Sequence, residues 1–417
     1  MSKMIITGGK KLSGTVSVHG AKNAVLPILA ATLLTKDISI IKNCPDLKDV
    51  RHTIEILTYL GAKVKRTGDT LIIDTKNADG VHIPEDLMRK MRSSIIFMGA
   101  ILSRNGYAKI SSPGGCELGP RPIDLHIKAL KDMGASVTEE HGYIICKSND
   151  LKATNIYLNF PSVGATENIM LSACTLPGET IISNVAKEPE IVDLADFLNS
   201  MGAKIKGAGE SEIKITGVDK LNGSTYSVMP DRIVAATYLC ALAMTGGDVT
   251  VTNINTSHLS CAVSILKEIG CDISANVNSI SISSNGNLKA PEEIKTMPYP
   301  GFPTDMQSQF LSLLTIASGT SIITENIFES RFRHAQELNR MGADITIVGR
   351  SAIIKGVPYL SAAKITAHDL RGAAALIIAA LGAKGETEIS DIDYLDRGYE
   401  DFAENLCKLG AQIKRIN

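Results

Sequence analysis

The sequence has no surplus of charge of either sign. Its 43 Lys and Arg residues balance 44 Asp and Glu residues, which gives a formal net charge of -1 over 417 residues. Duplex binding depends on a surplus of cations that meet phosphates, so this balance argues against nucleic acid as a partner. Any anion-binding site must therefore be built locally.

The sequence also lacks the segments that mark membrane proteins and metal sites. Its longest apolar run, at residues 373–383, is too short to span a bilayer, and residues 1–18 carry no stretch that resembles a signal sequence. We expect a cytosolic protein with no membrane partner. No Cys-x-x-Cys pair or His cluster suggests a metal, so we expect free thiols at Cys44, Cys116, Cys146, Cys174, Cys240, Cys261, Cys271 and Cys407.

Two nucleotide-binding signatures are missing as well. There is no complete G-x-G-x-x-G after a strand and no G-x-x-x-x-G-K-S/T, so the sequence does not support use of a dinucleotide or ATP.

The length of the chain indicates how many domains it forms. Single domains usually hold about 100 to 200 residues, so 417 residues predict two lobes.

One short phrase recurs six times: a large apolar residue, Gly, a small residue, any residue, then Val or Ile. Successive glycines are separated by 73, 68, 68, 72 and 68 residues, and they are Gly61, Gly134, Gly202, Gly270, Gly342 and Gly410. Before several of them runs an amphipathic helix, and Gly takes a left-handed helix-ending conformation at little steric cost. The pattern predicts six α/β units, three in each lobe, with the boundary near residues 226–231.

Each unit also contains a more apolar helix with polar residues at its start. The expected helices are residues 23–35, 93–102, 166–175, 232–245, 306–318 and 370–381, and the residues at their starts are Lys22, Arg92, Ser162, Asp231, Asp305 and Asp369. Helix N-termini favour anions, so equivalent ends can converge on one anionic ligand. Simple capping is the alternative for each Ser or Asp, but a cation there opposes the helix dipole.

A Gly- and Pro-rich loop at residues 112–126 places Cys116 between paired glycines and Arg121. A partly exposed thiol near Arg or a helix N-terminus can have a lowered pKa and serve as acid, base or nucleophile. A plain connecting loop is the alternative. The other cysteines lack such surroundings.

Six motifs in order carry a family resemblance over the whole chain. They are Gly20–Ala24 (GAKNA), Pro113–Cys116 (PGGC), Arg121–Leu125 (RPIDL), Pro161–Thr166 (PSVGAT), Tyr299–Gln307 (YPGFPTDMQ) and Asp396–Glu400 (DRGYE). Together they resemble the UDP-N-acetylglucosamine 1-carboxyvinyltransferases, which are enolpyruvyl transferases. The resemblance implies a two-lobed inside-out α/β barrel fold, with helices packed internally and sheets outside. Its lobes would be residues 1–21 with 230–417, where the N-terminal strand closes the lobe, and residues 22–229.

The resemblance also implies the substrates and their ligands, with no metal or organic cofactor. Phosphoenolpyruvate would be held by Lys22, Asn23, Arg121 and Arg397. UDP-N-acetylglucosamine would be contacted by Asn23, Arg92, Arg121, Pro122, Ile123, Asp124, Leu125, Ser162, Val163, Gly164, Asp305 and Ile327. Arg331 and Asp369 are weaker candidates.

The implied reaction is addition followed by elimination, with Cys116, Asp305, Lys22 and Arg397 as the catalytic residues. Cys116 would protonate the methylene carbon of phosphoenolpyruvate while Asp305 accepts the proton of the attacking sugar 3-hydroxyl. Loss of phosphate from the resulting ketal restores the double bond. Cys116 can also form a covalent phospholactoyl adduct. We expect the Cys116 loop to close as a lid over the bound sugar.

Two departures from the commonest members suggest the second paralogue found in some bacteria: Phe160, where a basic residue is frequent, and the run Arg371–Ala375. The nearest alternative function is the shikimate-pathway enolpyruvyl transferase, which normally lacks the Cys116 loop. A non-enzymatic repeat scaffold is another, but its mark would be a continuous basic stripe, which is not visible. We interpret His126 and His334 as structural rather than catalytic.

Overall fold

The computed structural model describes residues 2–111, 123–148 and 150–416, except for the side chain of Arg92. These residues form two compact units. Unit 1 comprises the chain up to His19 and from Pro230 onward, and unit 2 comprises Gly20 to Met229. Each unit has its own hydrophobic core.

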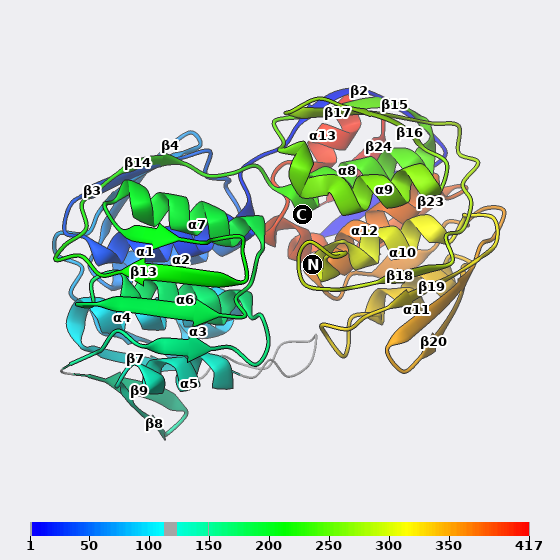
Figure 1. Cartoon of the computed structure of the whole chain (residues 1–417). Helices are drawn as coiled ribbons and strands as arrows, with labels where there is room; N and C mark the ends of the chain where they lie inside the picture. Colours follow the sequence, from blue (N-terminus) through cyan, green and yellow to red (C-terminus); the bar gives the residue numbers. More distant parts are fainter. Residues whose placement is uncertain (1, 112–122, 149, 417) are drawn as a thin grey trace. The chain divides into compact units, whose positions relative to one another are not determined.

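The described residues of unit 2 contain three four-stranded sheets (Figure 1). In each sheet the first pair of strands is parallel and the other two pairs are antiparallel. In spatial order they are β14 (Thr225–Ser227), β3 (Ile38–Lys42), β5 (Thr70–Asp74) and β4 (Lys63–Thr67); β6 (His82–Ile83), β7 (Tyr107–Ser111), β9 (Tyr143–Lys147) and β8 (Ser136–Glu140); and β10 (Asn155–Tyr157), β11 (Glu179–Ser183), β13 (Glu212–Thr216) and β12 (Lys204–Lys206).

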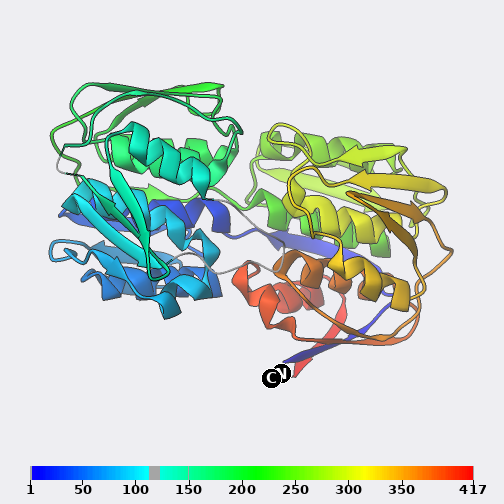
Figure 2. The same ribbon diagram turned by 90° about the horizontal axis from the view of Figure 1, so that it is seen from below.

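The described residues of unit 1 repeat this pattern in three more sheets. They are β2 (Leu12–Ser17), β15 (Gly247–Thr252), β17 (Ser279–Ser284) and β16 (Asp272–Ala275); β18 (Glu293–Lys295), β19 (Thr320–Thr324), β21 (Ser351–Lys355) and β20 (Asp344–Val348); and β22 (Lys364–Thr366), β23 (Glu386–Ser390), β1 (Lys3–Thr7) and β24 (Gln412–Ile416). Figure 2 shows the dark-blue N-terminal strand beside the red C-terminal strand. The first two strands of the chain therefore complete sheets of unit 1.

One set of helices is almost fully buried. In unit 2 these are α1 (Lys22–Ala31) with its 3₁₀ extension η1 (Thr32–Leu34), η2 (Arg92–Ile96) leading into α4 (Phe97–Asn105), and α6 (Val163–Ala173). In unit 1 they are α8 (Arg232–Thr245), η4 (Thr304–Met306) leading into α10 (Gln307–Leu314), and α12 (Leu370–Gly382). Helices α8, α10 and α12 pack against one another, as do α4 and α6 (Figure 1). Their starts are the positions at which the sequence gathers polar residues.

The second set of helices is amphipathic and ends at the repeated glycines. These helices are α2 (Lys48–Tyr59), α5 (Asp124–Asp132), α7 (Pro189–Ser200), α9 (Ser260–Glu268), α11 (Arg333–Arg340) and α13 (Phe402–Lys408). Each ends two residues before its glycine, and all six glycines have φ between 92° and 108°. The predicted helix-ending role of these glycines is thus confirmed, because only Gly adopts this conformation at little cost.

Three short elements remain, namely α3 (Glu85–Lys90), η3 (Thr256–Leu259) and η5 (Ile392–Arg397). In the described part of the chain, no helix is long and apolar enough to cross a membrane. Within the same residues, no group of three or more His, Cys, Asp or Glu side chains is arranged to hold a metal ion.

Candidate active site

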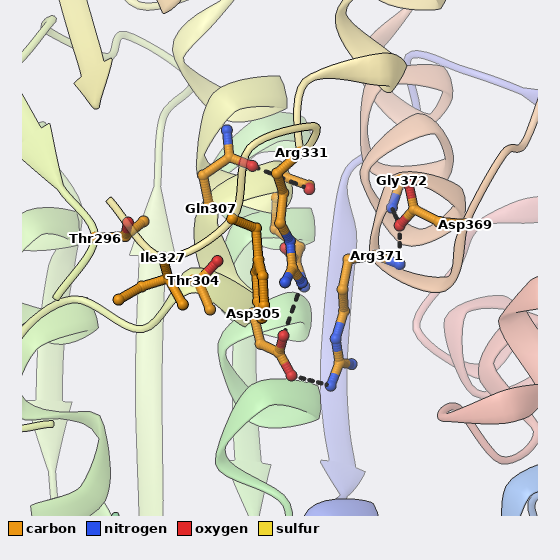
Figure 3. A network of polar contacts seen from close by, with 12 residues as sticks. Thr296, Thr304, Asp305, Gln307, Ile327, Arg331, Asp369, Arg371 and Gly372 are labelled. Atoms are coloured by element: carbon orange, nitrogen blue, oxygen red, sulfur yellow. Dashed lines mark hydrogen bonds and ion pairs between the residues drawn. The ribbon is translucent and has the colours of Figure 1, made fainter. Parts of the chain in front are cut away.

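Asp305 lies at the start of α10, where two buried arginines bind its carboxylate (Figure 3). Arg331 Nη2 donates to Oδ1 at 2.7 Å, and Arg371 Nη2 donates to Oδ2 at 2.9 Å. Each arginine is 3% exposed, whereas the Asp305 side chain is 26% exposed. The cluster of one carboxylate and two guanidinium groups carries a net positive charge, which suits an anionic ligand.

This pairing sets the proton affinity of Asp305. Burial by itself would raise the pKa of the carboxyl group, but Arg371 and then Arg331 hold the pKa well below its ordinary value. In this arrangement Asp305 is ionised and is a weak proton acceptor. The role implied by the family resemblance therefore requires at least one arginine contact to be released when the substrates bind.

Arg371 is itself supported by a buried polar cluster that the sequence did not reveal. Its guanidinium carbon lies 5.5 Å from the centre of the Tyr399 ring. The Tyr399 hydroxyl lies 2.9 Å from Thr237 Oγ1 and accepts from Gln309 Nε2 at 3.1 Å. Tyr399 stands two residues after Arg397, the last residue of η5, so the cluster links Arg371 to the segment that carries Arg397.

Asp369, a weaker candidate, is a helix cap. Its Oδ1 accepts from the backbone N–H groups of Arg371 and Gly372 at 2.9 Å each, which fixes the first turn of α12 (Figure 3). Nearby His334 is buried. Burial lowers the His334 pKa to about 4, so this ring is neutral at pH 7.

In unit 2, Lys22 begins α1 beside a buried carboxylate. Its Nζ lies 2.7 Å from Asp49 Oδ2, and the two side chains are 12% and 1% exposed. Asp49 offsets the unfavourable placement of a cation at a helix N-terminus. Asn23 follows in the first turn and is partly buried.

The starts of α5 and α6 lie close together in unit 2. Ser162 caps α6, since its Oγ accepts from the Ala165 N–H at 3.3 Å. A Cβ added at Gly164 would lie 3.0 Å from Cε1 of the buried His126. His126 Nδ1 in turn lies 2.7 Å from Asn168 Nδ2 of α6. The structure therefore brings the start of α5 close to the start of α6 through His126. The segments at these two starts, Ile123–Leu125 and Ser162–Gly164, are expected to contact the nucleotide sugar.

The remaining candidates divide into two groups. Ile327 and Arg397 are partly buried residues of unit 1. Cys116, Arg121, Pro122 and the side chain of Arg92 lie outside the described part of the structure. Their roles therefore rest on the sequence motifs.

The fold is that of the enolpyruvyl transferases. The enolpyruvyl transferase NikO from Streptomyces tendae matches with a TM-score of 0.90 and 25% identity, over 99% of this chain and 98% of that one. An EPSP synthase from Acinetobacter baumannii shares the fold, with a TM-score of 0.76, 22% identity and full coverage of both chains. The family model for EPSP synthase (3-phosphoshikimate 1-carboxyvinyltransferase) matches residues 6–406, and the chain belongs to this family of enolpyruvyl transferases.

Within the family, the chain is similar over its full length to several proteins that share the same name. It is 53% identical over its full length to UDP-N-acetylglucosamine 1-carboxyvinyltransferase 2 of Caldanaerobacter subterraneus subsp. tengcongensis, and 49% identical to enzyme 1 of that organism over 99% of both chains. It is 48% identical to the UDP-N-acetylglucosamine 1-carboxyvinyltransferase of Geobacter metallireducens, with full coverage of both chains.

Proposed function

We propose that this protein transfers the enolpyruvyl group of phosphoenolpyruvate to the 3-hydroxyl of UDP-N-acetylglucosamine and releases phosphate, the first committed step of peptidoglycan synthesis. The observation that carries the proposal is the similarity to relatives named for this activity. The chain is identical to them at about half of all positions, and each match covers the full length of both chains. The shikimate-pathway reaction is less supported, because the similarity to EPSP synthase structures is only 22% and concerns the fold alone.

We also propose the finer architecture, in which six repeats, three in each unit, form an inside-out α/β barrel fold. Its support is the burial pattern. Nearly every residue of α8, α10 and α12 is buried, whereas strands such as β13 alternate between buried and exposed side chains. In this proposal the sheets form the outside of each unit. We further propose that the protein works in the cytoplasm.

In the proposed reaction Lys22, Asn23, Arg121 and Arg397 bind the phosphate and carboxylate of phosphoenolpyruvate, and Cys116 gives a proton to its methylene carbon. The sugar 3-oxygen bonds to the adjacent carbon, and the hydroxyl proton passes to Asp305. The ketal then expels phosphate as the Cys116 thiolate takes back a methyl proton, which restores the carbon–carbon double bond.

The nucleotide sugar is proposed to contact Asn23, Arg92, Arg121–Leu125, Ser162–Gly164, Asp305 and Ile327. The support in unit 2 is the proximity of the α5 and α6 starts through His126 and Gly164. The support in unit 1 is the positively charged cluster around Asp305, which favours an anionic ligand.

The test is a phosphate-release assay with the purified protein. Phosphoenolpyruvate with UDP-N-acetylglucosamine should release phosphate, and phosphoenolpyruvate with shikimate 3-phosphate should not. Cys116→Ser should nearly abolish release, whereas Cys407→Ser, which changes an exposed thiol, should leave it unchanged. Phosphate release with shikimate 3-phosphate as the acceptor, and none with UDP-N-acetylglucosamine, would overturn the proposal.

An epoxide phosphonate gives a second readout of the same thiol. Fosfomycin should add its mass to the peptide that contains Cys116, and labelling should be faster when UDP-N-acetylglucosamine is present. Labelling spread evenly over several cysteines would count against a specially reactive Cys116.

A further inference from the structure

Glu325 is a buried carboxylate that no sequence motif singled out. It directly follows β19 and is 1% exposed. Its Oε1 accepts from Thr296 Oγ1 at 2.8 Å and from the backbone N–H groups of Ile327 and Phe328 at 2.8 and 3.1 Å. Its Oε2 accepts from Thr304 Oγ1 at 2.8 Å. One side chain thus ties together three separate segments.

Two of these segments carry candidate substrate ligands. Thr304 directly precedes Asp305, and Ile327 is an expected contact of the nucleotide sugar. Figure 3 shows Thr296, Thr304 and Ile327 near one another and beside Asp305. The Glu325 carboxylate therefore accepts a hydrogen bond from Thr304, the residue next to Asp305, and the proposed reaction uses the carboxylate of Asp305.

Comparison of the repeats sets the position of Glu325 apart. After the second strand of three other sheets, an Asn with φ of 52° to 57° follows at once, and its side chain donates to the carbonyl just beyond the neighbouring parallel strand; these residues are Asn43, Asn184 and Asn253. Asn326 makes the equivalent bond to the Thr296 carbonyl at 3.2 Å. It stands one position later, and Glu325 lies between the end of β19 and Asn326.

The electrostatics also separate Glu325 from an ordinary structural residue. Its four donors in the described part of the chain are all neutral. Burial of a carboxylate without a cationic partner is costly, and a neutral side chain that packs well would usually be more stable. Four hydrogen bonds satisfy this carboxylate, and together they fix the segments that lie beside Asp305.

We propose that Glu325 is a positioning residue for the enolpyruvyl transfer reaction, which rests on the proposed function. Its Oε2 holds the Thr304–Asp305 turn, and its Oε1 holds the Ile327 backbone against the nucleotide sugar. Loss of the first contact would misplace the proton acceptor, and loss of the second would weaken sugar binding.

Three variants separate these contacts. Glu325→Gln keeps the shape but places an amide N–H₂ group where one oxygen accepts. Thr304→Val removes only the hydroxyl that holds the Asp305 turn. Glu293→Gln is the matched control, since this exposed carboxylate lies in the same sheet and pairs with Lys295 at 2.7 Å. The measurements are kcat, KM for each substrate and melting temperature, with assays run well below melting.

Glu325→Gln should lower kcat by about 10- to 100-fold and raise KM for UDP-N-acetylglucosamine several-fold, because small misplacements of reacting groups cost rates of this order. Thr304→Val should lower kcat with little change in KM, and Glu293→Gln should match the wild type. Suppose that the wild-type enzyme is active and that Glu325→Gln has the same kcat and KM, even with a lower melting temperature. That result would overturn the inference about Glu325 and leave the proposed function standing. A wild-type enzyme without phosphate release would overturn the proposed function and the inference together.

Discussion

Asp305 and Arg371 form an ion pair of 2.9 Å between residues 66 positions apart in the sequence. The pair has opposite effects on binding and on acid–base chemistry. With Arg331 it creates a positive cluster for an anion, yet it keeps Asp305 from accepting a proton. Substrate anions that recruit the arginines would relieve this restraint. The basicity of Asp305 would then depend on the presence of the substrates.

The first prediction concerns Arg371→Gln. Glutamine removes the positive charge that does most to lower the pKa of Asp305, so this pKa should rise toward its ordinary value. If Asp305 accepts the proton, the acidic limb of the kcat/KM–pH profile, which reports groups of the free enzyme, should move to higher pH. A profile that overlays the wild type would argue against Asp305 as the acceptor. Arg51→Gln, in an exposed pair with Asp46, serves as the control.

The sequence located the helix starts well but not every helix end. Residues 232–245 were expected as a helix and are α8, whereas the helix expected at 306–318 starts in the 3₁₀ turn η4 and ends at Leu314. The apolar pattern continues beyond Leu314 because buried coil needs the same residue types as buried helix. Hydrophobicity alone therefore cannot mark such an end.

The site was predictable as a set of residues and not as a set of contacts. Lys22 and Asp305 stood out from their positions in motifs, but their partners Asp49 and Arg371 lie in other segments and are chosen by tertiary packing. Glu325 had a detectable signal, the displaced Asn of its repeat. That signal can be recognised only when the ends of the strands are known.

Gly164→Ala tests the contact between the α5 and α6 starts. The new Cβ would lie 3.0 Å from His126 Cε1 and 3.3 Å from Nε2, so the ring, which Asn168 holds, has to shift. KM for UDP-N-acetylglucosamine should rise several-fold while KM for phosphoenolpyruvate changes little. Ala173→Gly, at the other end of α6, should cost about 1 kcal/mol of stability without this effect on KM. Equal changes in both KM values would contradict the assignment.

Gly20→Ala should destabilise the protein severely. A Cβ at this position would lie 1.8 Å from the backbone oxygen of Asn43, which cannot move away without disturbing the end of β3. We expect a loss of about 3 kcal/mol or more, measured by chemical denaturation. Gly68→Ala is the control, since its Cβ would meet nothing within 4 Å and only its positive φ would be strained. Similar losses in both variants would show that the backbone at Gly20 relaxes.

Asp193 should make the stability of unit 2 depend on pH. Its carboxylate accepts from the Tyr226 hydroxyl at 2.7 Å and the Met229 N–H at 3.2 Å, but burial outweighs both bonds and raises its pKa from 3.8 to about 6. The folded state therefore holds this proton more tightly than the unfolded state, and stability present below pH 4 is lost as pH rises through 6. For this group alone the loss is about 3 kcal/mol. Asp193→Asn removes it, so the free energy of unfolding of the wild type relative to the variant should fall by about 2.4 kcal/mol between pH 4 and pH 7, the rest of the change lying below pH 4. Contributions from other groups cancel in this difference, and a constant difference across the range would show that folding does not raise the pKa of Asp193.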